Sequence, residues 1–414
     1  MFPFESRLHL TRANLVETTL ELVGFETSNP PGDTREIVAW LESHLSELGL
    51  EPERYADDPT KPNVLATLPG EREATLLYCG HLDTVPFDPD GWSFDPLGER
   101  VGDRIYGRGT TDMKGAIAAM LEVARAYKET GIRPPVTLAF AFVSDEEIAG
   151  DAGVAALLEA DRLDADACVI GEPTCTDETR SITVADRGSI WLTLESTGEA
   201  AHGSRPMLGE NAIDRLWATI ETIRRRLENR TLSIPASIEP IVEESVEYYT
   251  TELGEPTARR LFERPTINLG TIEGGKSINS VPRFARAQLD VRLAAGVETE
   301  AVLEELREWV RAQEGVTIAE TSWSVGTYED PNSPLVTATK SVAEAVLEGH
   351  VARRSATGGG DAKRLRNAGI PTVEFGVGTD TVHACDEYTT VDALSATAEV
   401  YARLPAAIAS SGWD

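Results

Sequence analysis

The chain has 414 residues, too many for a single hydrophobic core, so its length favours two domains. A formal net charge of −31 makes nucleic acid and anionic membranes poor partners. Only six of the 38 basic residues are lysines. Together with the excess of acids, this predicts a halophilic protein, because concentrated salt screens most of the repulsion between surface charges.

Cysteine spacing and the lengths of the apolar runs indicate the cellular compartment. The four cysteines form no CxxC pair, which favours a reducing compartment. Residues 1–17 contain no long apolar run, so no secretory signal is expected there. No apolar stretch reaches the roughly 18 residues of a membrane span. We therefore expect a cytoplasmic protein without a membrane partner.

Hydrophobic periodicity predicts alternating helices and strands in the two outer parts of the chain. The predicted helices are 11–24, 34–50 and 111–131, and the predicted strands are 63–68, 74–80, 135–142, 167–171 and 372–378. The last three strands are almost continuously apolar, as strands buried on both faces are. This pattern predicts an α/β domain with a largely parallel sheet and helices on both faces.

The middle of the chain follows a different pattern. Its predicted elements are strand 182–196, helix 211–229, strands 265–275 and 285–295, helix 299–313 and strand 316–325. This βαββαβ order is that of a ferredoxin-like domain. We therefore predict that residues 182–327 form a domain inserted into a larger one built from 1–181 and 328–414. The acidic segment 233–264 has no predicted place in either.

Acidic residues and histidines gather where the apolar strands end. They are His81 and Asp83, the consecutive acids Asp145, Glu146 and Glu147, Glu172, Asp112 before a helix, and His383 near the C-terminus. Parallel strands present their chemistry at their carboxyl ends. Adjacent carboxylates repel each other unless cations lie between them, and His with Asp or Glu is a ligand set for zinc or a similar metal. Two ions about 3.5–4 Å apart can activate a shared water, and a spare glutamate can take its proton.

Each of these features also has a plain structural interpretation. An EE pair is often a solvated face, an isolated HxD has no function in most chains, and His383 alone could be a surface histidine. From the residues alone, the metal site and a coincidence of polar strand ends both stay open.

Several segments resemble motifs of one enzyme family in the order in which that family has them. The segments are YCGHLDTVP (78–86), GRGTTDMKG (107–115), SDEEIAG (144–150), GEPT (171–174), AAHGSRP with LGENAI (200–213), INSVP with DVR (278–292) and TVHACDEY (381–388). The chain resembles the acetylornithine deacetylase, succinyl-diaminopimelate desuccinylase, aminoacylase and carboxypeptidase G family of dinuclear zinc hydrolases. The resemblance covers essentially the whole chain and implies a zinc-exopeptidase-like catalytic domain with an inserted ferredoxin-like lid or dimerisation domain.

The resemblance implies two Zn²⁺ ions per subunit, with Co²⁺ or Mn²⁺ as possible substitutes. The implied ligands are His81 and Glu172 for one ion, Glu147 and His383 for the other, and Asp112 as a bridge followed by a cis peptide. It further implies that Glu146 is the general base and that Asp83 holds the imidazole of His81.

The resemblance also assigns residues outside the metal site. His202 would stabilise the oxyanion in the site of a partner subunit, which implies a homodimer through the inserted domain. Asn279 and Arg292 would hold a substrate carboxylate, and Gly358 and Gly359 belong to a glycine-rich substrate loop. The alternatives are a capped loop histidine for His202, a surface ion pair for Arg292 and a plain loop before a helix for the glycines.

The implied reaction is hydrolysis of an N-acyl amino acid or a short peptide. Desuccinylases tend to carry two basic residues before the glycine that opens the inserted domain, but here Asp186 and Arg187 precede Gly188, which weakens a succinyl substrate. A carboxypeptidase G-like or dipeptidase activity is the alternative. Two further classes are a non-catalytic relative, disfavoured because every implied ligand is present, and an aminopeptidase, disfavoured by the inserted domain with His202 and Arg292.

Overall fold

The computed structural model describes residues 8–176 and 178–411, which form two compact units. The first unit contains the residues up to Val184, Glu329–Arg354 and the residues from Gly360 onwards. The second contains Ala185–Tyr328 and Ser355–Gly359.

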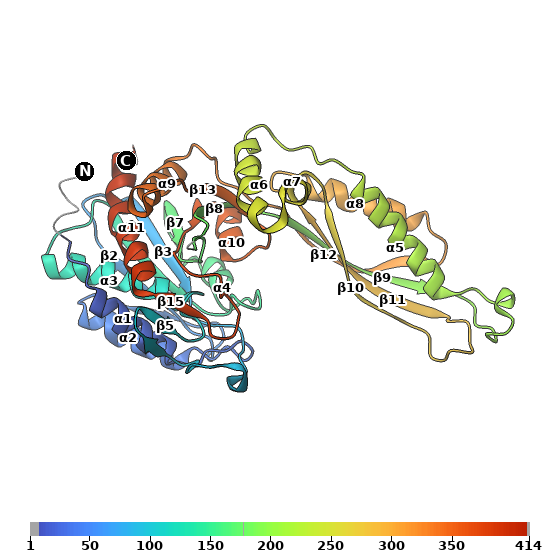
Figure 1. Ribbon diagram of the computed structural model, residues 1–414, viewed down its shortest axis with the longest axis horizontal. Helices are drawn as coiled ribbons and strands as arrows, with labels where there is room; N and C mark the ends of the chain where they lie inside the picture. Colours follow the sequence, from blue (N-terminus) through green and yellow to red (C-terminus); the bar gives the residue numbers. More distant parts are fainter. Residues whose placement is uncertain (1–7, 177, 412–414) are drawn as a thin grey trace. The chain divides into compact units, whose positions relative to one another are not determined.

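A mixed eight-stranded sheet forms the centre of the first unit (Figure 1). Its strands, in spatial order, are β1 (Glu53–Tyr55), β2 (Asn63–Leu68), β6 (Thr137–Val143), β3 (Thr75–His81), β7 (Ala167–Ile170), β14 (Thr372–Glu374), β8 (Ser181–Asp186) and β13 (Ala352–Ala356). Strands β6, β3, β7 and β14 are parallel, whereas β1, β2 and β8 pair antiparallel with their neighbours. The sheet is therefore parallel at its centre and antiparallel towards its edges.

The parallel centre brings strand ends to one edge of the sheet. His81, the last residue of β3, pairs with Val143, the last residue of β6. Ile170, which ends β7, pairs with Cys79 on one side and with Glu374 on the other. The segments that follow these strands therefore start side by side.

Helices cover both faces of this sheet. They are α1 (Arg12–Val23), α2 (Arg35–Glu47), α3 (Lys114–Thr130), α4 (Val154–Glu159), α9 (Pro334–Leu347), α10 (Asp361–Asn367) and α11 (Val391–Ser410). Helices α3 and α11 pack together with α1 and α9 beside them, α4 packs on α10, and Figure 1 shows the sheet between these two groups. The apolar side chains of α3, such as Ile117 and Met120, are buried, and the helix ends at Gly131, whose φ of 65° suits a residue without a side chain.

A three-stranded sheet, which the sequence pattern did not predict, joins two distant segments of the first unit. Its strands are β4 (Glu99–Val101), β5 (Arg104–Tyr106) and β15 (Tyr388–Thr390), with β5 in the middle. Tyr388 pairs with Tyr106, so the residues after His383 lie beside those that lead to Asp112.

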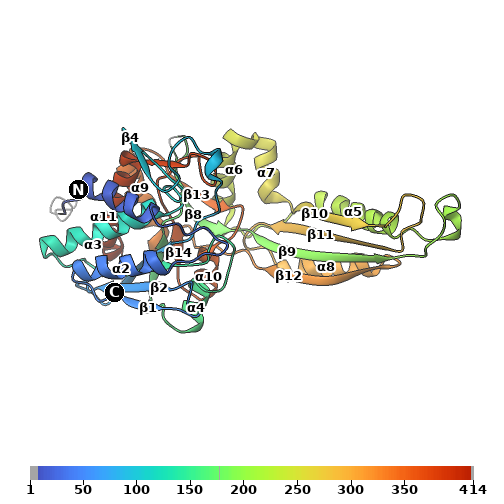
Figure 2. The same cartoon turned by 90° about the horizontal axis from the view of Figure 1, so that it is seen from below.

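The second unit has the ferredoxin-like arrangement that the sequence predicts (Figure 2). Strands β9 (Gly188–Thr197), β10 (Thr266–Gly274), β11 (Phe284–Leu293) and β12 (Val316–Ser324) form an antiparallel sheet in the order β10-β11-β9-β12. Helices α5 (Ala212–Glu228) and α8 (Thr299–Arg311) lie on one face, and their apolar stripes meet the inward residues of β9 and β11 in one buried cluster.

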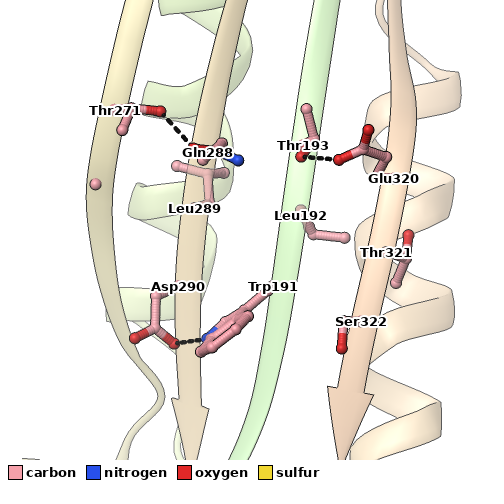
Figure 3. Close-up of a pocket in the computed structure, with 11 residues that line it drawn as sticks. Trp191, Leu192, Thr193, Thr271, Gln288, Leu289, Asp290, Glu320, Thr321 and Ser322 are labelled. Carbon is pink, nitrogen blue, oxygen red and sulfur yellow. Dashed lines mark hydrogen bonds between the residues drawn. The ribbon is translucent and has the colours of Figure 1, made fainter. Parts of the chain in front are cut away.

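The other face of this sheet is open. It forms a hollow of about 510 Å³ in which Trp191 donates from Nε1 to Asp290 and Thr193 donates to Glu320 (Figure 3). These contacts join neighbouring strands and support the sheet.

The acidic segment without a predicted place forms two helices, α6 (Glu239–Leu253) and α7 (Glu255–Glu263). They pack on each other through a small cluster of Val242, Val246, Ala258 and Phe262. Within the described part of the chain, no helix has both the length and the apolar character needed to cross a bilayer.

Candidate metal centre

The first unit brings five candidate ligands together from five separate segments. His81 ends β3, Glu147 follows β6, Glu172 follows β7, Asp112 precedes α3 and His383 precedes β15. The parallel strands deliver the first three to one edge of the sheet, and the small β5–β15 pairing draws the loops of Asp112 and His383 together.

Asp112 lies between the two histidines. Its Oδ1 is 3.0 Å from Nε2 of His81, and its Oδ2 is 3.1 Å from Nε2 of His383. The peptide between Asp112 and Met113 is cis, as the family resemblance implied. One carboxylate thus offers a different oxygen to each imidazole.

Each imidazole has a second carboxylate beside it. Oε1 of Glu172 is 3.5 Å from Nε2 of His81, and Oε2 of Glu147 is 3.2 Å from Nε2 of His383. The other oxygen of Glu147 accepts the backbone N–H of Val85 at 3.2 Å, which turns Oε2 toward the histidine. The contacts therefore form two triads that share Asp112.

The donor set fits divalent first-row metals. Ligand atoms of His81, Glu146 and Glu172, and of His81, Asp112 and Glu147, lie within 4.8 Å of one another. These groupings overlap, and the shorter contacts of 3.0 to 3.5 Å divide the ligands into the two triads. One imidazole nitrogen and two carboxylate oxygens in each triad are zinc-type ligands, and cobalt and manganese accept the same donors.

The pKa shifts show how strongly the acids act on the imidazoles. Hydrogen bonds to Asp112 and Glu147 raise the pKa of His383 to about 10. Burial lowers the pKa of His81, but the hydrogen bond to Asp112 and the charges of Glu172 and Asp112 outweigh it, so the pKa is raised well above its ordinary value. Burial also raises the pKa of Glu172. The cluster thus retains protons that bound cations would displace.

Glu146 is not part of either triad. Burial, together with the charges of Asp361, Asp112 and Glu147, raises its pKa to about 8. Gly360 leaves room for its carboxylate, since a Cβ at that position would come within 2.5 Å of Oε1 of Glu146. Glu146 therefore stands beside the ligands as a carboxyl that can both take and release a proton near neutral pH.

Two buried residues that sequence reasoning did not single out hold the Asp112 loop. Glu387 accepts the backbone N–H groups of Gly109, Thr111 and Asp112 at 3.1, 2.9 and 3.1 Å. Arg108 pairs with Glu387 at 2.6 Å and donates to the carbonyl of His383 at 3.3 Å. The only signal in the sequence was a charged residue inside each of two motifs, GRGTTD and TVHACDEY.

The resemblance assigned the Asp83 side chain to His81, and the structure shows a different contact. Nδ1 of His81 lies 2.9 Å from the backbone carbonyl of Asp83 but 3.8 Å from its carboxylate. The latter distance is too long for a hydrogen bond.

The remaining predicted residues lie in the second unit. His202 is exposed, with Nδ1 2.7 Å from Oγ of Ser204, and the neighbouring Gly203 donates to the carbonyl of Asn279 at 2.6 Å. Nε of Arg292 donates to Asp290 at 2.7 Å. This contact is the ion pair that the alternative, structural interpretation of Arg292 expects. Gly358 and Gly359 are exposed in the segment Ser355–Gly359. The structure thus joins the loops of His202 and Asn279 to each other.

Comparison with known proteins agrees with this fold. Residues 77–407 match peptidase family M20/M25/M40. A succinyl-diaminopimelate desuccinylase of Parvibaculum lavamentivorans is 29% identical over 409 residues, 93% of each chain. Aminoacylase-1 of Sus scrofa is 28% identical over 93% of this chain and 92% of its own. An M20 family metallo-carboxypeptidase from Sulfolobus solfataricus superposes with a TM-score of 0.77 at 21% identity, covering 95% of this chain and 99% of that one; this similarity speaks for the fold alone.

Fold, ligand triads and family match together define a metal-dependent hydrolase of amide bonds. The chain belongs to peptidase family M20/M25/M40, which confirms the resemblance found in the sequence motifs.

Proposed function

We propose that the protein is a two-metal deacylase that removes the acyl group from an N-acyl amino acid. The observation that carries this proposal is Asp112, whose two oxygens lie at hydrogen-bond distance from two different imidazoles. With Glu172 on one side and Glu147 on the other, the chain offers one bridging carboxylate and two further ligands for each ion.

Two zinc ions per subunit suit these donors, and cobalt or manganese could take their place. His81 and Glu172 would hold one ion, Glu147 and His383 the other, and Asp112 both. Bound ions would polarise the scissile carbonyl and lower the pKa of a water molecule.

Glu146 is the proposed general base. Its carboxyl has a pKa of about 8 among the side chains alone, caused first by burial, so it is suited to accept a proton from the attacking water. The same carboxyl then passes the proton to the leaving nitrogen of the amide.

Recognition of the substrate falls in this proposal to the second unit, which includes the glycine segment. Arg292 would bind the substrate carboxylate together with Asn279, since a guanidinium matches a carboxylate with two parallel hydrogen bonds. The backbone N–H groups of Gly358 and Gly359 would approach an anionic end of the substrate. His202 would donate to the oxyanion that forms at the carbonyl.

We further propose a cytoplasmic homodimer assembled through residues 182–327, with His202 serving the site of the partner subunit. Support comes from apolar side chains that flank this histidine and Asn279 in the sequence: Met207 is 77% exposed, Leu208 63% and Ile278 fully exposed. Exposed apolar side chains gathered in neighbouring loops mark an interaction surface.

The acyl group is proposed to be small and uncharged. Asp186 stands where a desuccinylase tends to have a basic residue, so the chain has one cation fewer to attract a carboxylate at the far end of the acyl group.

Hydrolysis of a panel of substrates tests this proposal. The panel contains N-acetylornithine, other N-acetyl amino acids, N-succinyl-diaminopimelate and unmodified dipeptides, assayed in molar salt with zinc or cobalt supplied. We expect turnover of N-acetylated amino acids, and we expect Glu146→Gln to lower kcat by about 100- to 10,000-fold. The control Glu159→Gln, which removes an exposed carboxylate of α4, should leave kcat unchanged.

Turnover of dipeptides alone would move the protein to the carboxypeptidase G-like or dipeptidase alternative. Full activity of Glu146→Gln on any substrate would show that another group is the base.

A further inference from the structure

The helical hairpin α6–α7, built by the acidic segment 233–264, has no role in the proposed reaction. Its two helices pack on each other through an apolar cluster, and Arg259 of α7 donates to Glu243 of α6 at 3.0 Å (Figure 2). The cluster includes the fully buried side chains of Ala258 and Phe262. The hairpin is therefore a folded part of the second unit with an apolar contact of its own.

Both ends of the hairpin are fixed to the second unit. The side chain of Ile234, just before α6, packs against the hairpin's cluster and also against the large cluster under the four-stranded sheet. Ile238 is buried beside Gly296, where a Cβ would lie 3.0 Å from its Cδ1. At the other end, the carbonyl of Glu263 accepts the backbone N–H of Leu232 at 2.8 Å. The hairpin thus has a defined place on the core of this unit.

A buried hydroxyl group of α6 contacts the segment that carries the glycines. Oγ of Ser245 accepts the backbone N–H of Ser355 at 2.8 Å and donates to the carbonyl of Ile241 at 2.6 Å, one turn earlier in the helix. Ser245 is fully buried and Ser355 is 3% exposed, so water does not compete for these hydrogen bonds. Ser355 begins the segment Ser355–Gly359, which belongs to the same unit. The helix therefore holds the backbone where the glycine segment starts.

The glycines of this segment are open to a ligand. Gly358 and Gly359 are exposed, and a Cβ at Gly358 would meet no atom of the described chain within 4 Å. The φ angle of Gly358 lies outside the left-handed region, so its backbone conformation is accessible to other residues. Neither packing nor conformation within the chain thus requires glycine at this position. Close approach of a ligand to the backbone is a further reason for a glycine.

We propose that the hairpin α6–α7 is a positioning element of the substrate site, in which Ser245 fixes the glycine segment for substrate binding. This inference rests on the proposed function, in which the N–H groups of Gly358 and Gly359 approach the substrate. A segment that is ordered before the substrate arrives loses less conformational entropy on binding, so the substrate binds more tightly. Ser245 would act through the backbone of Ser355 and would not touch the substrate.

The experiment compares wild type with Ser245→Ala and Thr219→Val. Ser245→Ala leaves the N–H group of Ser355 buried without its acceptor, so the start of the glycine segment should open more often. Thr219 of α5 provides the matched control. Its buried hydroxyl also donates to a carbonyl one turn earlier, that of Arg215 at 2.9 Å, and it has no second hydrogen-bond partner in the part of the chain that the structure describes.

Hydrogen–deuterium exchange, followed by mass spectrometry of proteolytic peptides, measures this opening without any substrate. In Ser245→Ala, the peptide that contains Ser355–Gly359 should exchange about 5- to 30-fold faster than in the wild type. Peptides of α5 and β9 should keep their wild-type rates. Thr219→Val should leave the exchange of the glycine peptide unchanged.

Kinetics with an N-acyl amino acid that the wild type hydrolyses give the second readout. Ser245→Ala should raise KM by about 5- to 30-fold and leave kcat unchanged, because the metal ligands and the base lie in the first unit and are not altered. The number of bound ions should equal that of the wild type. If Ser245→Ala does not fold by circular dichroism, Ser245→Cys takes its place and should show the same changes by smaller factors, since sulfur is a weak acceptor.

Three results would overturn the inference. They are wild-type exchange of the glycine peptide in the Ser245 variant, faster exchange with an unchanged KM, and faster exchange throughout the second unit, which would indicate a purely structural role. An equal rise of KM in Thr219→Val would also contradict it. Failure of the wild type to hydrolyse any N-acyl amino acid would instead contradict the proposed function. The two failures are distinguishable, because hydrogen exchange needs no substrate.

Discussion

The candidate residues of the metal centre and those of the loops around His202 differ in burial and in the contacts that position them. His81 and Asp112 are buried, and Asp112 contacts both histidines of the centre. His202 is exposed, and its ring contacts Ser204, two residues away. The first arrangement is fixed by the sheet and the loops on it, whereas the second leaves the ring accessible.

This difference separates the parts of the proposal that need only a single chain from those that need a dimer. The centre has its ligands, its base and its supporting hydrogen bonds within the first unit, although the ring of His383 is about half exposed. The exposed loops offer a histidine and apolar side chains without such support. In our account, the centre binds metal in any single chain, and the loops contribute only in a dimer.

Breaking the buried support of the centre should have the largest effect on stability. Glu387→Gln removes the charge opposite Arg108, whose side chain is only 5% exposed. We expect a loss of about 3–5 kcal/mol in the free energy of unfolding, because an unpaired guanidinium stays buried. Urea unfolding measures it. The matched control is Glu399→Gln, which breaks the more exposed pair with Arg403 and should cost about 1 kcal/mol or less. Equal losses in the two variants would mean that the Arg108–Glu387 pair does not support the loop.

Removing the exposed histidine should damage catalysis and nothing else. His202→Ala should lower kcat by about 100- to 1,000-fold, the effect of losing one oxyanion donor. Ion content and the urea midpoint should equal those of the wild type, since the side chain is exposed. His350→Ala, at another exposed histidine, is the control and should keep full activity. A wild-type kcat for His202→Ala would remove this residue from the mechanism.

The metal-free protein should lose stability as pH rises. Folding raises the pKa of Glu146 from 4.5 to about 8 and that of His383 from 6.5 to about 10. Both groups bind protons more tightly in the folded chain, so their contribution falls between about pH 5 and about pH 10. Urea midpoints in the presence of a chelator measure the trend. Bound ions should reduce it, since they displace these protons. A midpoint that rises with pH in the chelator would contradict the assigned shifts.

Salt should act on the charged surface more than on the centre. With a net charge of −31, the folded chain repels itself, and screening relieves this. We expect a higher Tm at about 2 M than at about 0.1 M potassium chloride, with the number of bound ions unchanged. A Tm independent of salt would refute the halophilic hypothesis.

Part of this picture could be predicted from the sequence. The apolar runs ending at His81 and before Asp145 marked the strands, and the motifs on them marked the candidate ligands. Strand direction could not be predicted, because an apolar run has the same pattern in a parallel and an antiparallel pair; β8 proved antiparallel to β14. The β5–β15 pairing, and with it the Arg108–Glu387 contact, joins segments about 280 positions apart that have no shared pattern.

The side-chain contacts of Asp83 could not be predicted from the sequence for a similar reason. The resemblance associated it with the nearby His81, but hydrogen bonds to the backbone of Glu146 and Glu147 depend on a turn that only the fold defines. The helices α6 and α7 were missed because few apolar side chains of this acidic segment are buried, and they pack between the two helices, as Val242 and Phe262 do.

The most direct test of the account is the number of ions that the purified protein binds, measured together with that of Asp112→Ala. Equilibrium dialysis against zinc, with the bound metal measured by atomic absorption, gives both values. The account predicts two ions per chain in the wild type and loss of high-affinity binding at both positions in Asp112→Ala, because that residue belongs to both triads. One ion per wild-type chain, or a variant that loses only one of two, would contradict a centre bridged by Asp112.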